Sequence, residues 1–468
     1  PPRSTLFPYT TLFRSDKSDF IFSGKLNRYD LWFSEHPAGD TRIEFDLVSH
    51  LLKLEDVFSY KGENYVPEDY RHEELRELKV HGLTDLHFKE GLQSMDLRLD
   101  RFDARMKVHP MKAENFKGRI HYEKEHLVVE DFSGKLGKSI FRTTMHYYMG
   151  KDEAVKKRDN RFELSSPHLD FDELFSYNAI PSSKTSVPVD HDAGFNIYDL
   201  PFSDMSIQVN IGHLNYHKYL LHNLKGKLRM TKNHYLHIDE LHLEAAGGAF
   251  DMTGYFNGSN PKLIYFSPKM NVRNVDLDKL LFKFDNFGQD HLVSENLHGK
   301  LSGTITGKIH MHNDLVPKID DSEIHLDVTV LNGRLENYAL FDYMAEYFAD
   351  KNMKKVMFDT LTNKIDIVNG TMNIPKMSIN SSIGFMEISG KQEMGGQMNM
   401  EYYIRIPWKM VTQAASSKLF GKKTEEVDPE QIDAIQYADP EKKIRYVNVK
   451  VTGNALEYKI SLGKEKKK

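Results

Sequence analysis

The chain has 468 residues, of which 40% are hydrophobic, 28% charged and 11% aromatic, and this composition suits a folded protein with a large core. Its formal charge of -5 comes from 63 basic and 68 acidic residues mixed along the chain, so no basic face for nucleic acid is indicated. The absence of cysteine excludes disulfides, thiolate metal sites and cysteine nucleophiles. No apolar run reaches the roughly 18 to 20 residues that a membrane helix needs.

The N-terminal segment from Thr5 to Ser15 reads TLFPYTTLFRS and fits neither a helical nor a strand pattern. Its reverse translation resembles a widely used sequencing adapter. We therefore predict that residues 1–15 are a non-native, adapter-derived segment and that the protein proper begins near Asp16. The natural start, with a membrane helix of about 20 residues, is expected upstream.

A strand followed by one acidic helical turn occurs three times along the chain. Residues 45–60 (FDLVSHLLKLEDVFSY) and 162–177 (FELSSPHLDFDELFSY) match without a gap, and residues 270–281 (MNVRNVDLDKLL) form a weaker third copy. Internal similarity of this kind indicates a repeat protein. The acidic residues at each helix start suit the helix dipole. We predict short helices at 54–60 and 171–177.

A second repeated element follows the strand and turn. Residues 114–126 (ENFKGRIHYEKEH) and 222–234 (HNLKGKLRMTKNH) share Asn, Lys, Gly, Lys and His at equal spacing. Equivalent positions are therefore predicted for Phe45 and Phe162, and likewise for Gly118 and Gly226. The predicted division of the chain is the adapter segment at 1–15, leading strands at 16–41, repeat units at 42–150, 160–258 and 263–411, an amphipathic stretch and loop at 412–443, a closing strand hairpin at 444–463 and a basic tail at 464–468.

Most of the sequence alternates apolar and polar residues with a period of two, which is typical of strands with one apolar face. Gly-containing turns such as Asn257-Gly258 separate successive strands. A helical stripe over 337–351 predicts one longer helix that caps the sheet. The fold is therefore expected to be mainly β, an elongated, repetitive antiparallel sheet curled into a trough, with a few short helices. The candidate lining residues are Met205, Ile207, Val209, Ile211, Ile324, Leu326, Val328, Val330, Met398, Met400, Tyr402, Ile404, Ile406, Val447, Val449 and Val451.

No catalytic motif is complete. GKLGKS at 134–139 lacks the second glycine of a phosphate loop, because Phe132 occupies that position. HEELR at 72–76 lacks the second histidine of a zinc helix. The sequence therefore predicts no catalytic residue and no cofactor.

Three histidines on neighbouring strand positions, His234, His237 and His242, raise the question of a metal site. No carboxylate or cysteine completes a tight ligand spacing around them, so histidines on a solvent-facing side of the strand are favoured. No metal is predicted.

A sheet with one apolar face has to cover that face. Too few helices are predicted for a helical layer, so two arrangements remain open. Two sheets from the chain can close into a dry sandwich, or one sheet can form a trough whose apolar floor is covered by lipid tails.

The stretch 297–406 carries the clearest family pattern, in LNGRLENYALFDYMAEYFADKN (331–352) and in IDIVNGTMNIPKMSINSSIGFMEISGKQEMGGQMNMEYYIRIP (365–407), with a weaker extension to YVNVKVTGNALEY (446–458). It resembles the AsmA-like proteins of Gram-negative envelopes, particularly those of Bacteroidota. The resemblance implies an N-terminal inner-membrane helix, a curled periplasmic sheet and a role in outer-membrane assembly or phospholipid movement. This chain departs from the family pattern by lacking the anchor.

The expected function is a non-enzymatic apolar path for phospholipid or another acyl lipid between the inner and outer membranes. The expected location is the periplasm, anchored to the inner membrane through the missing helix, with possible envelope protein partners and no nucleic acid. A second reading is a β-rich periplasmic scaffold with a closed core that binds envelope proteins. A third, a lipid hydrolase, would need a polar constellation that the sequence does not contain.

Overall fold

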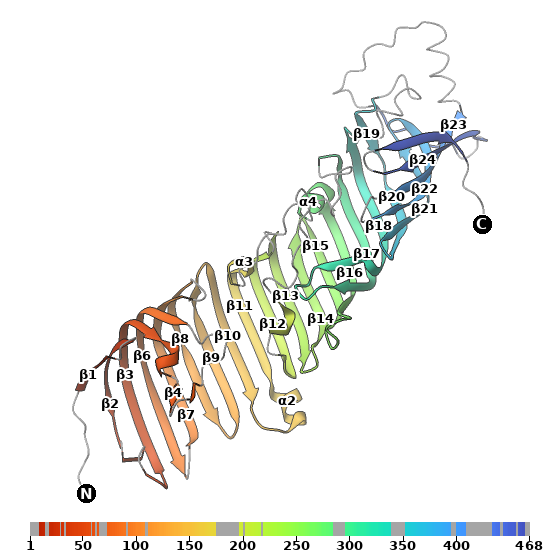
Figure 1. The fold of residues 1–468 in the computed structure, drawn as a ribbon. Coiled ribbons are helices and arrows are strands. Elements are labelled where there is room, and N and C mark those ends of the chain that lie inside the picture. The colour runs from red at the N-terminus through yellow and green to blue at the C-terminus, as the bar shows by residue number, and fades with distance from the viewer. Residues whose placement is uncertain are drawn as a thin grey trace. The chain divides into compact units, whose positions relative to one another are not determined.

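The computed structural model shows a chain made almost entirely of β-strands (Figure 1). The described residues are 9–14, 18–57, 59–64, 73–174, 196–283, 295–337, 352–408, 433–439 and 443–463, with short internal gaps at 29, 32–33, 61–62, 90–91, 108–110, 200–201, 217–218, 395–398 and 455–456. The expectation of a mainly β, repetitive antiparallel fold with few short helices is confirmed.

The chain divides into two compact units. Unit 1 comprises Pro1–Asn178 and Phe202–Asn233, and unit 2 comprises Ala179–Pro201 and His234–Lys468. The boundary between them falls inside the stretch 160–258, so the compact units are a different division from the sequence repeats. The three-repeat division stays a prediction.

Unit 1 is one sheet in which strands pair with their sequence neighbours. All of these pairings are antiparallel except that of β11 with β12, which is parallel. The elements are β1 (Tyr9–Arg14), β2 (Asp19–Leu26), β3 (Ala38–Lys53), α1 (Leu54–Val57), β6 (Glu74–Lys89), β7 (Leu92–Met106), β8 (Lys112–Glu123), β9 (His126–Leu136), β10 (Ser139–Tyr148), α2 (Glu153–Asp159), β11 (Arg161–Asp170), α3 (Phe171–Leu174), β12 (Met205–Tyr216) and β13 (Tyr219–Thr231), with a small hairpin of β4 (Ser59–Tyr60) and β5 (Glu63–Asn64).

Unit 2 is likewise one sheet of antiparallel neighbours, in which β18 is long enough to pair with both β19 and β20. Its elements are a 3-10 turn (Ile197–Asp199), β14 (Tyr235–Ala245), β15 (Gly248–Asn257), β16 (Tyr265–Asp276), α4 (Leu277–Lys283), β17 (Leu297–Met311), β18 (Pro317–Glu336), β19 (Lys355–Phe358), β20 (Leu361–Val368), β21 (Thr371–Ser381), β22 (Gly384–Glu393), β23 (Met400–Pro407), β24 (Tyr446–Gly453) and β25 (Tyr458–Leu462). The predicted closing hairpin corresponds to β24 and β25.

Three expectations about local structure need comment. The helix predicted at 54–60 ends at Val57, and β4 begins at Ser59, because the β-branched and aromatic residues here favour a strand. The segment expected to lack regular structure contains β1, whose Thr, Leu and Phe residues also suit a strand. The helix predicted at 337–351, the last three residues of that at 171–177, and most of 412–443 lie outside the described residues.

Equivalent serines make the same contact in the first two sequence copies. The Ser18 Oγ accepts a hydrogen bond from the backbone N–H of Lys53 at 3.0 Å, and the Ser139 Oγ accepts one from Asp170 at 3.0 Å. Ser18 directly precedes β2 and Ser139 is the first residue of β10, and in both places the partner is the last residue of the strand paired with it. The two copies therefore share this hydrogen bond as well as their sequence similarity.

Each strand that precedes a repeat helix ends in a buried apolar residue. Leu52, Leu169 and Val275 have relative exposures of 6%, 4% and 0%, and each belongs to its own small hydrophobic cluster. The helix that follows, α1, α3 or α4, begins two residues after this buried residue in each case. The three copies thus provide three equivalent core clusters along one edge of the strands.

The predicted equivalence of Gly118 and Gly226 stays a prediction, but the backbone before each glycine shares one feature. Asn115 and Asn223, three residues before each glycine, both adopt a left-handed conformation, with φ of 55° and 49°. Asn is one of the few non-glycine residues that tolerates this region. Each copy therefore places a local irregularity of the strand at the same position.

The parallel pairing of β11 with β12 has a simple origin in the repeat. Two strands, β6 and β7, separate the first strand and helix copy from the Gly118 strand β8. Only β12 separates the second copy from the Gly226 strand β13. Successive antiparallel strands alternate in direction. The second copy has one strand fewer, so its Gly226 strand keeps the same direction relative to the first strand of the copy only if one pair of strands is parallel.

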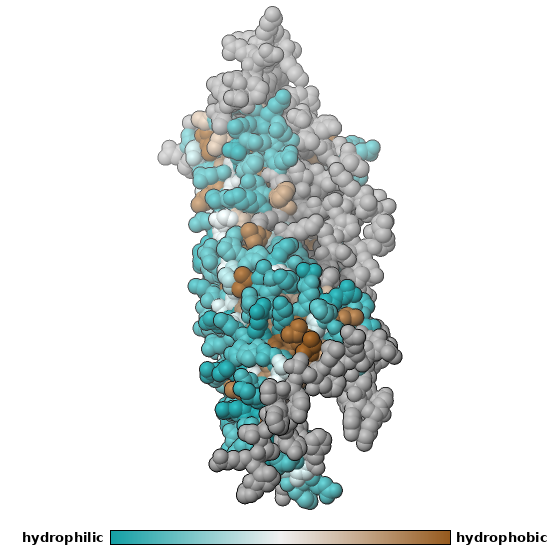
Figure 2. Space-filling view, turned by 90° about the vertical axis from the view of Figure 1, so that its left-hand side faces the viewer, coloured by the Kyte–Doolittle hydropathy of each residue, from teal (hydrophilic) through white to brown (hydrophobic). Residues whose placement is uncertain are grey.

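The outer face of both sheets carries charged pairs in direct register. Five His–Asp pairs lie exactly opposite each other across neighbouring strands, with Nδ1 to Oδ1 distances of 2.6 to 2.8 Å: His81–Asp46, His87–Asp40, His121–Asp96, His242–Asp251 and His325–Asp366. The hydrogen bond to Asp366 raises the pKa of His325 above its ordinary 6.5. The surface shown in Figure 2 is mostly hydrophilic, with small separate hydrophobic patches. The face with the His–Asp pairs is thus polar and suited to exposure to water.

Glu74 is the most strongly shifted carboxyl of unit 1. Its side chain is only 8% exposed and contacts Lys107 at 2.7 Å and Arg76 at 3.1 Å, and these bonds lower its pKa to about 2. A carboxyl with a lowered folded-state pKa adds stability that is complete above its ordinary pKa and is lost as pH falls toward the folded value.

We therefore expect the melting temperature of the parent to exceed that of Glu74→Gln above pH 4.5, and the difference to shrink toward zero as pH falls to about 2. Thermal melts by circular dichroism across this range measure it. Glu44→Gln, at a carboxyl that is half exposed beside Lys25, is the control and should change little. A difference that is independent of pH would contradict this account.

Candidate functional site

A row of side chains crosses unit 1 on the face opposite the charged pairs. Each member lies directly opposite the next one in the cross-strand register, and we call this set the unit 1 row. Its members are Ile43, Thr84, Leu97, Ile120, Val129, Met145, Phe162, Ile207 and Leu228, one from each of nine strands from β3 to β13.

The apolar members of the unit 1 row are all half-buried, and none is fully buried. Thr84, at 9% exposure, is the one polar and buried member. In a closed sandwich, apolar side chains of a central row would be buried against the opposing sheet. Among the described residues the only other sheet is the small hairpin of β4 and β5. The row is therefore an apolar surface without a second sheet over it.

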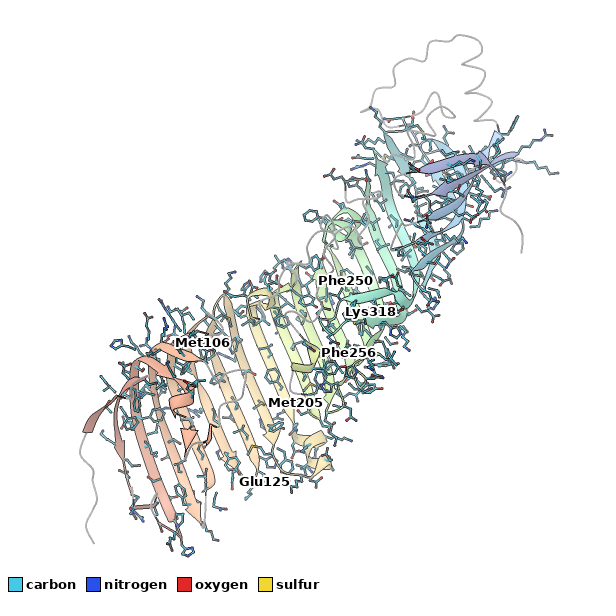
Figure 3. All side chains as sticks on the ribbon, viewed as in Figure 1. Met106, Glu125, Met205, Phe250, Phe256 and Lys318 are labelled. Carbon is cyan, nitrogen blue, oxygen red and sulfur yellow. The ribbon has the colours of Figure 1, made fainter. Side chains whose placement is uncertain are left out.

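Unit 2 contains a similar row, which we call the unit 2 row. Its members are again in direct register and again half-buried: Leu241, Met252, Met270, Ile305, Leu326 and Ile365, from β14 to β20. Figure 3 shows side chains on both sides of a single layer of strands in each unit. Both units thus present the same kind of partly exposed apolar face.

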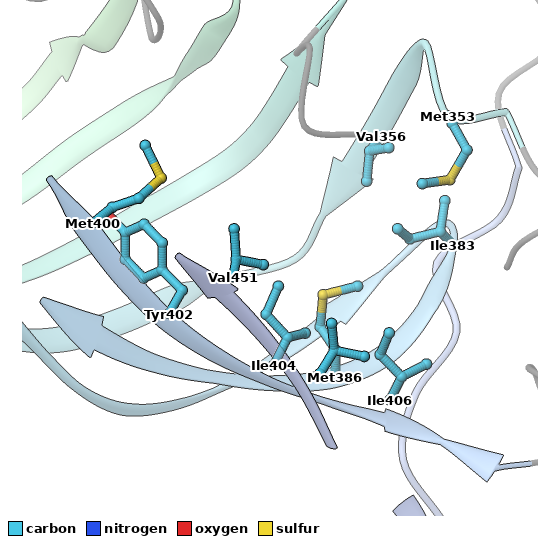
Figure 4. Close-up of a cluster of buried hydrophobic side chains, with 10 residues drawn as sticks. Met353, Val356, Ile383, Met386, Met400, Tyr402, Ile404, Ile406 and Val451 are labelled. Carbon is cyan, nitrogen blue, oxygen red and sulfur yellow. The ribbon is translucent and has the colours of Figure 1, made fainter. Parts of the chain in front are cut away.

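At the C-terminal end of unit 2 the apolar face is closed. The C-terminal cluster contains Met353, Val356, Ile383, Met386, Met400, Tyr402, Ile404, Ile406, Val449 and Val451, all at 9% exposure or less (Figure 4). Met353 and Val356 come from the segment at β19, far from β23 in the sequence, and belong to the same cluster as the β23 residues. The strands β22 to β24 therefore form an ordinary dry core.

This closed core corrects one expectation about the candidate lining residues. The run from Met400 to Ile406 and the partner residues Val449 and Val451 were expected to face an uncovered surface, but they are buried. Val447 is partly buried against the same cluster, and Met398 lies outside the described residues. The physical reason is the non-local packing of Met353 and Val356, which the alternation of a single strand does not reveal.

The other candidate lining residues divide between the rows and the small clusters. The half-buried ones are Met205, Ile207, Val209, Leu326, Val328 and Val330, and the buried ones are Ile211 at 3% and Ile324 at 8%. Of these, Ile207 and Leu326 belong to the rows themselves, and the rest flank them. Their role as a lipid lining stays a prediction.

Sequence reasoning missed most of the unit 1 row, from Leu97 to Phe162. These strands contain residues with left-handed backbone conformations, such as Glu77, Asn115 and Asp131, and the register shifts beside Glu77 and Asn115. An extra residue of this kind is a β-bulge, which interrupts the period of two and increases the local twist. The signal that remains is the short alternation on either side of each bulge.

The edge that carries the repeat helices is held by carboxylates. The backbone N–H of Lys138, in the turn between β9 and β10, donates to Glu173 of α3 at 2.6 Å. Gly137 in this turn has φ of 58°, and a Cβ there would meet the Glu173 carboxylate. The GKLGKS segment is thus a turn filled by an acidic side chain, which is an unsuitable environment for a phosphate.

The histidines expected on a solvent-facing side of the strand behave as structural groups. His242 pairs with Asp251 at 2.8 Å, and His237 lies between the rings of Tyr235 and Tyr255. Within the described residues no group of His, Asp and Glu side chains is placed to hold a metal ion. None of the helices in the described part of the chain has the length and apolarity to cross a membrane.

Comparison with known proteins found no match to any family model, any curated protein or any solved structure. The rows, their exposure and the charged groups beside them are therefore the features that bear on function.

An Ile→Lys substitution should destabilise the C-terminal cluster much more than the unit 1 row. Ile404→Lys buries an unpaired charge in the C-terminal cluster and should cost about 3–5 kcal/mol of stability. Ile207→Lys, on the unit 1 row, can extend its ammonium group into water and should cost about 1 kcal/mol. Urea denaturation of both variants measures the contrast, and equal large losses would show that the unit 1 row is also a closed core.

Proposed function

We propose that this chain is a non-enzymatic envelope protein whose apolar rows carry phospholipid between the inner and outer membranes and so support outer-membrane assembly. The observation that carries the proposal is the half-buried state of both rows, which leaves in each unit an apolar surface without a covering sheet among the described residues. An acyl chain is a natural cover for such a surface.

The free-energy cost of exposing an acyl chain to water favours a lipid as the occupant of the rows. Each exposed CH₂ costs about 0.8 kcal/mol, so a lipid tail of roughly 16 carbons faces a penalty on the order of 12 kcal/mol in an aqueous gap. Contact with an apolar row removes most of that penalty. Movement along the row needs no nucleophile and no cofactor.

The composition of the rows suits a varied ligand. Met145 in unit 1 and the directly opposed pair Met252 and Met270 in unit 2 are flexible, polarisable side chains. Unbranched thioethers of this kind adapt their shape to different partners. We infer that the rows accept acyl chains of more than one length or saturation.

The resemblance of 297–406 to AsmA-like proteins supports the location assigned here. In this proposal the chain lies in the periplasm, is attached to the inner membrane by a helix that precedes the present sequence, and works with envelope protein partners. The direction of lipid movement and its energy source come from those partners.

A second candidate function is a β-rich periplasmic scaffold that binds envelope proteins at its edges. The C-terminal cluster favours the scaffold function for its part of unit 2, because the apolar residues of this cluster are buried. A lipid hydrolase, the third reading of the sequence, has no observation in its favour.

The test of lipid binding compares three purified proteins. The parent is expected to carry lipid detectable by organic extraction and mass spectrometry, and Ile207→Lys should lose most of it while keeping its fold, because a charge interrupts the unit 1 row. Val368→Lys, on the opposite face beside Glu323 and 37% exposed, is the control and should keep the lipid. A parent without lipid, even after incubation with phospholipid vesicles, would favour the scaffold.

A further inference from the structure

A set of basic side chains lies at one edge of unit 1, around α2. This short helix joins the end of β10 to the start of β11 (Figure 1). Arg161 opens β11, and Lys232 directly follows β13. We call this set the basic cluster; its cations are Lys151, Lys156, Lys157, Arg158, Arg161 and Lys232, and the carboxylates of the α2 segment are Asp152, Glu153 and Asp159, with Glu125 close to Gly150.

The carboxylates of the basic cluster already have partners. Asp152 accepts the backbone N–H of Ala154 at 2.8 Å, Glu153 pairs with Lys156 at 3.5 Å and Lys232 at 3.2 Å, and Asp159 pairs with Arg158 at 2.6 Å. In the described part of the chain, no carboxylate lies within ion-pair distance of Lys151 or Lys157, and both side chains are exposed. These two ammonium groups are therefore available to an anion.

Arg161 adds a third positive charge. Its guanidinium Nη2 lies 2.8 Å from the Nε2 of His146, a ring that is neutral or positive and so cannot neutralise it. Burial lowers the pKa of His146, and the charge of Arg161 lowers it further, while Glu130 and Glu163 act in the opposite direction. The field at this edge therefore favours a negative ligand.

The basic cluster adjoins the apolar surface of the same unit. Phe162, which lies opposite Met145 in the unit 1 row, is the second residue of β11, so the row passes close to the edge that carries α2; Arg161, one residue earlier, points to the opposite, charged face with His146. Lys232 follows two residues after Met230, which lies directly opposite Met205. An apolar strip and a group of cations thus lie side by side at one edge of the sheet.

We propose that the basic cluster binds the anionic head group of a lipid whose acyl chain lies on the unit 1 row. This inference rests on the proposed function and narrows its substrate to anionic phospholipids. Exposed lysines hold a free anion only weakly, because water and salt screen them. A head group tethered to a bound tail meets the same lysines at a high effective concentration, so the lipid is the favoured source of the phosphate.

The experiment measures binding of fluorescent phosphatidylglycerol and phosphatidylcholine with identical acyl chains to the full chain. The parent should prefer phosphatidylglycerol roughly fivefold at low salt, and the preference should fall at high salt. The double variant Lys151→Glu with Lys157→Glu should lose the preference and still bind phosphatidylcholine as the parent does. Lys157→Gln alone should reduce the preference partly.

The matched control is the double variant Lys364→Glu with Lys391→Glu in unit 2, where the two lysines are 80% and 61% exposed. It makes the same change of charge away from the basic cluster and should keep the parental preference.

The possible failures are distinct from one another. A parent that binds neither lipid overturns the proposed function and this inference together. A parent that binds both lipids equally, or a Lys151 and Lys157 double variant that keeps the preference, overturns the head-group site alone. Calorimetry with inorganic phosphate measures the affinity of the chain for a free anion. If phosphate binds as tightly as phosphatidylglycerol, the ligand of the basic cluster is a free anion and not a lipid head group.

Discussion

The structure depends on one constraint. A single layer of strands has two faces, and among the described residues only the face with the His–Asp pairs is polar enough to be exposed to water without a cover. The strands satisfy their backbone hydrogen bonds laterally, so each sheet can grow by adding strands without adding a second layer. The His–Asp pairs keep the outer face hydrated. The other face carries the unit 1 and unit 2 rows, whose apolar members are half-buried.

Stability in such an arrangement has to come from the edges and ends. Leu52, Leu169 and Val275 anchor separate small clusters at equivalent positions, and each is followed by a short helix. The C-terminal cluster provides a larger dry core in unit 2. Repeat proteins of this type gain stability from interactions between neighbouring elements rather than from one central core. The middle of each sheet is thereby left free to present an apolar surface.

The local features were predictable from the sequence, and the non-local ones were not. The strand and helix copies around Leu52 and Leu169 follow from short-range patterns, and alternation correctly placed Ile207 and Leu326 on the apolar face. The bulge at Asn115 interrupts that alternation, so the row through Ile120 and Met145 could be seen only in the register. Ile404 is buried in a cluster that also contains Met353, about 50 residues away, and no pattern within β23 encodes this shared cluster.

The size of the unit 1 row accounts for why a lipid tail would stay on it. Complete burial of a large apolar side chain is worth about 1.5–3 kcal/mol, so a partly exposed one forgoes a fraction of this. The eight apolar members of the row together forgo on the order of a few kcal/mol, which adds to the cost of about 12 kcal/mol for one acyl tail in water. Contact between the two surfaces relieves both costs at once. Because the row is apolar from Leu97 on β7 to Leu228 on β13, a tail can shift from one of these strands to the next without losing the contact, and the charges at α2 would then set which head group travels with the tail.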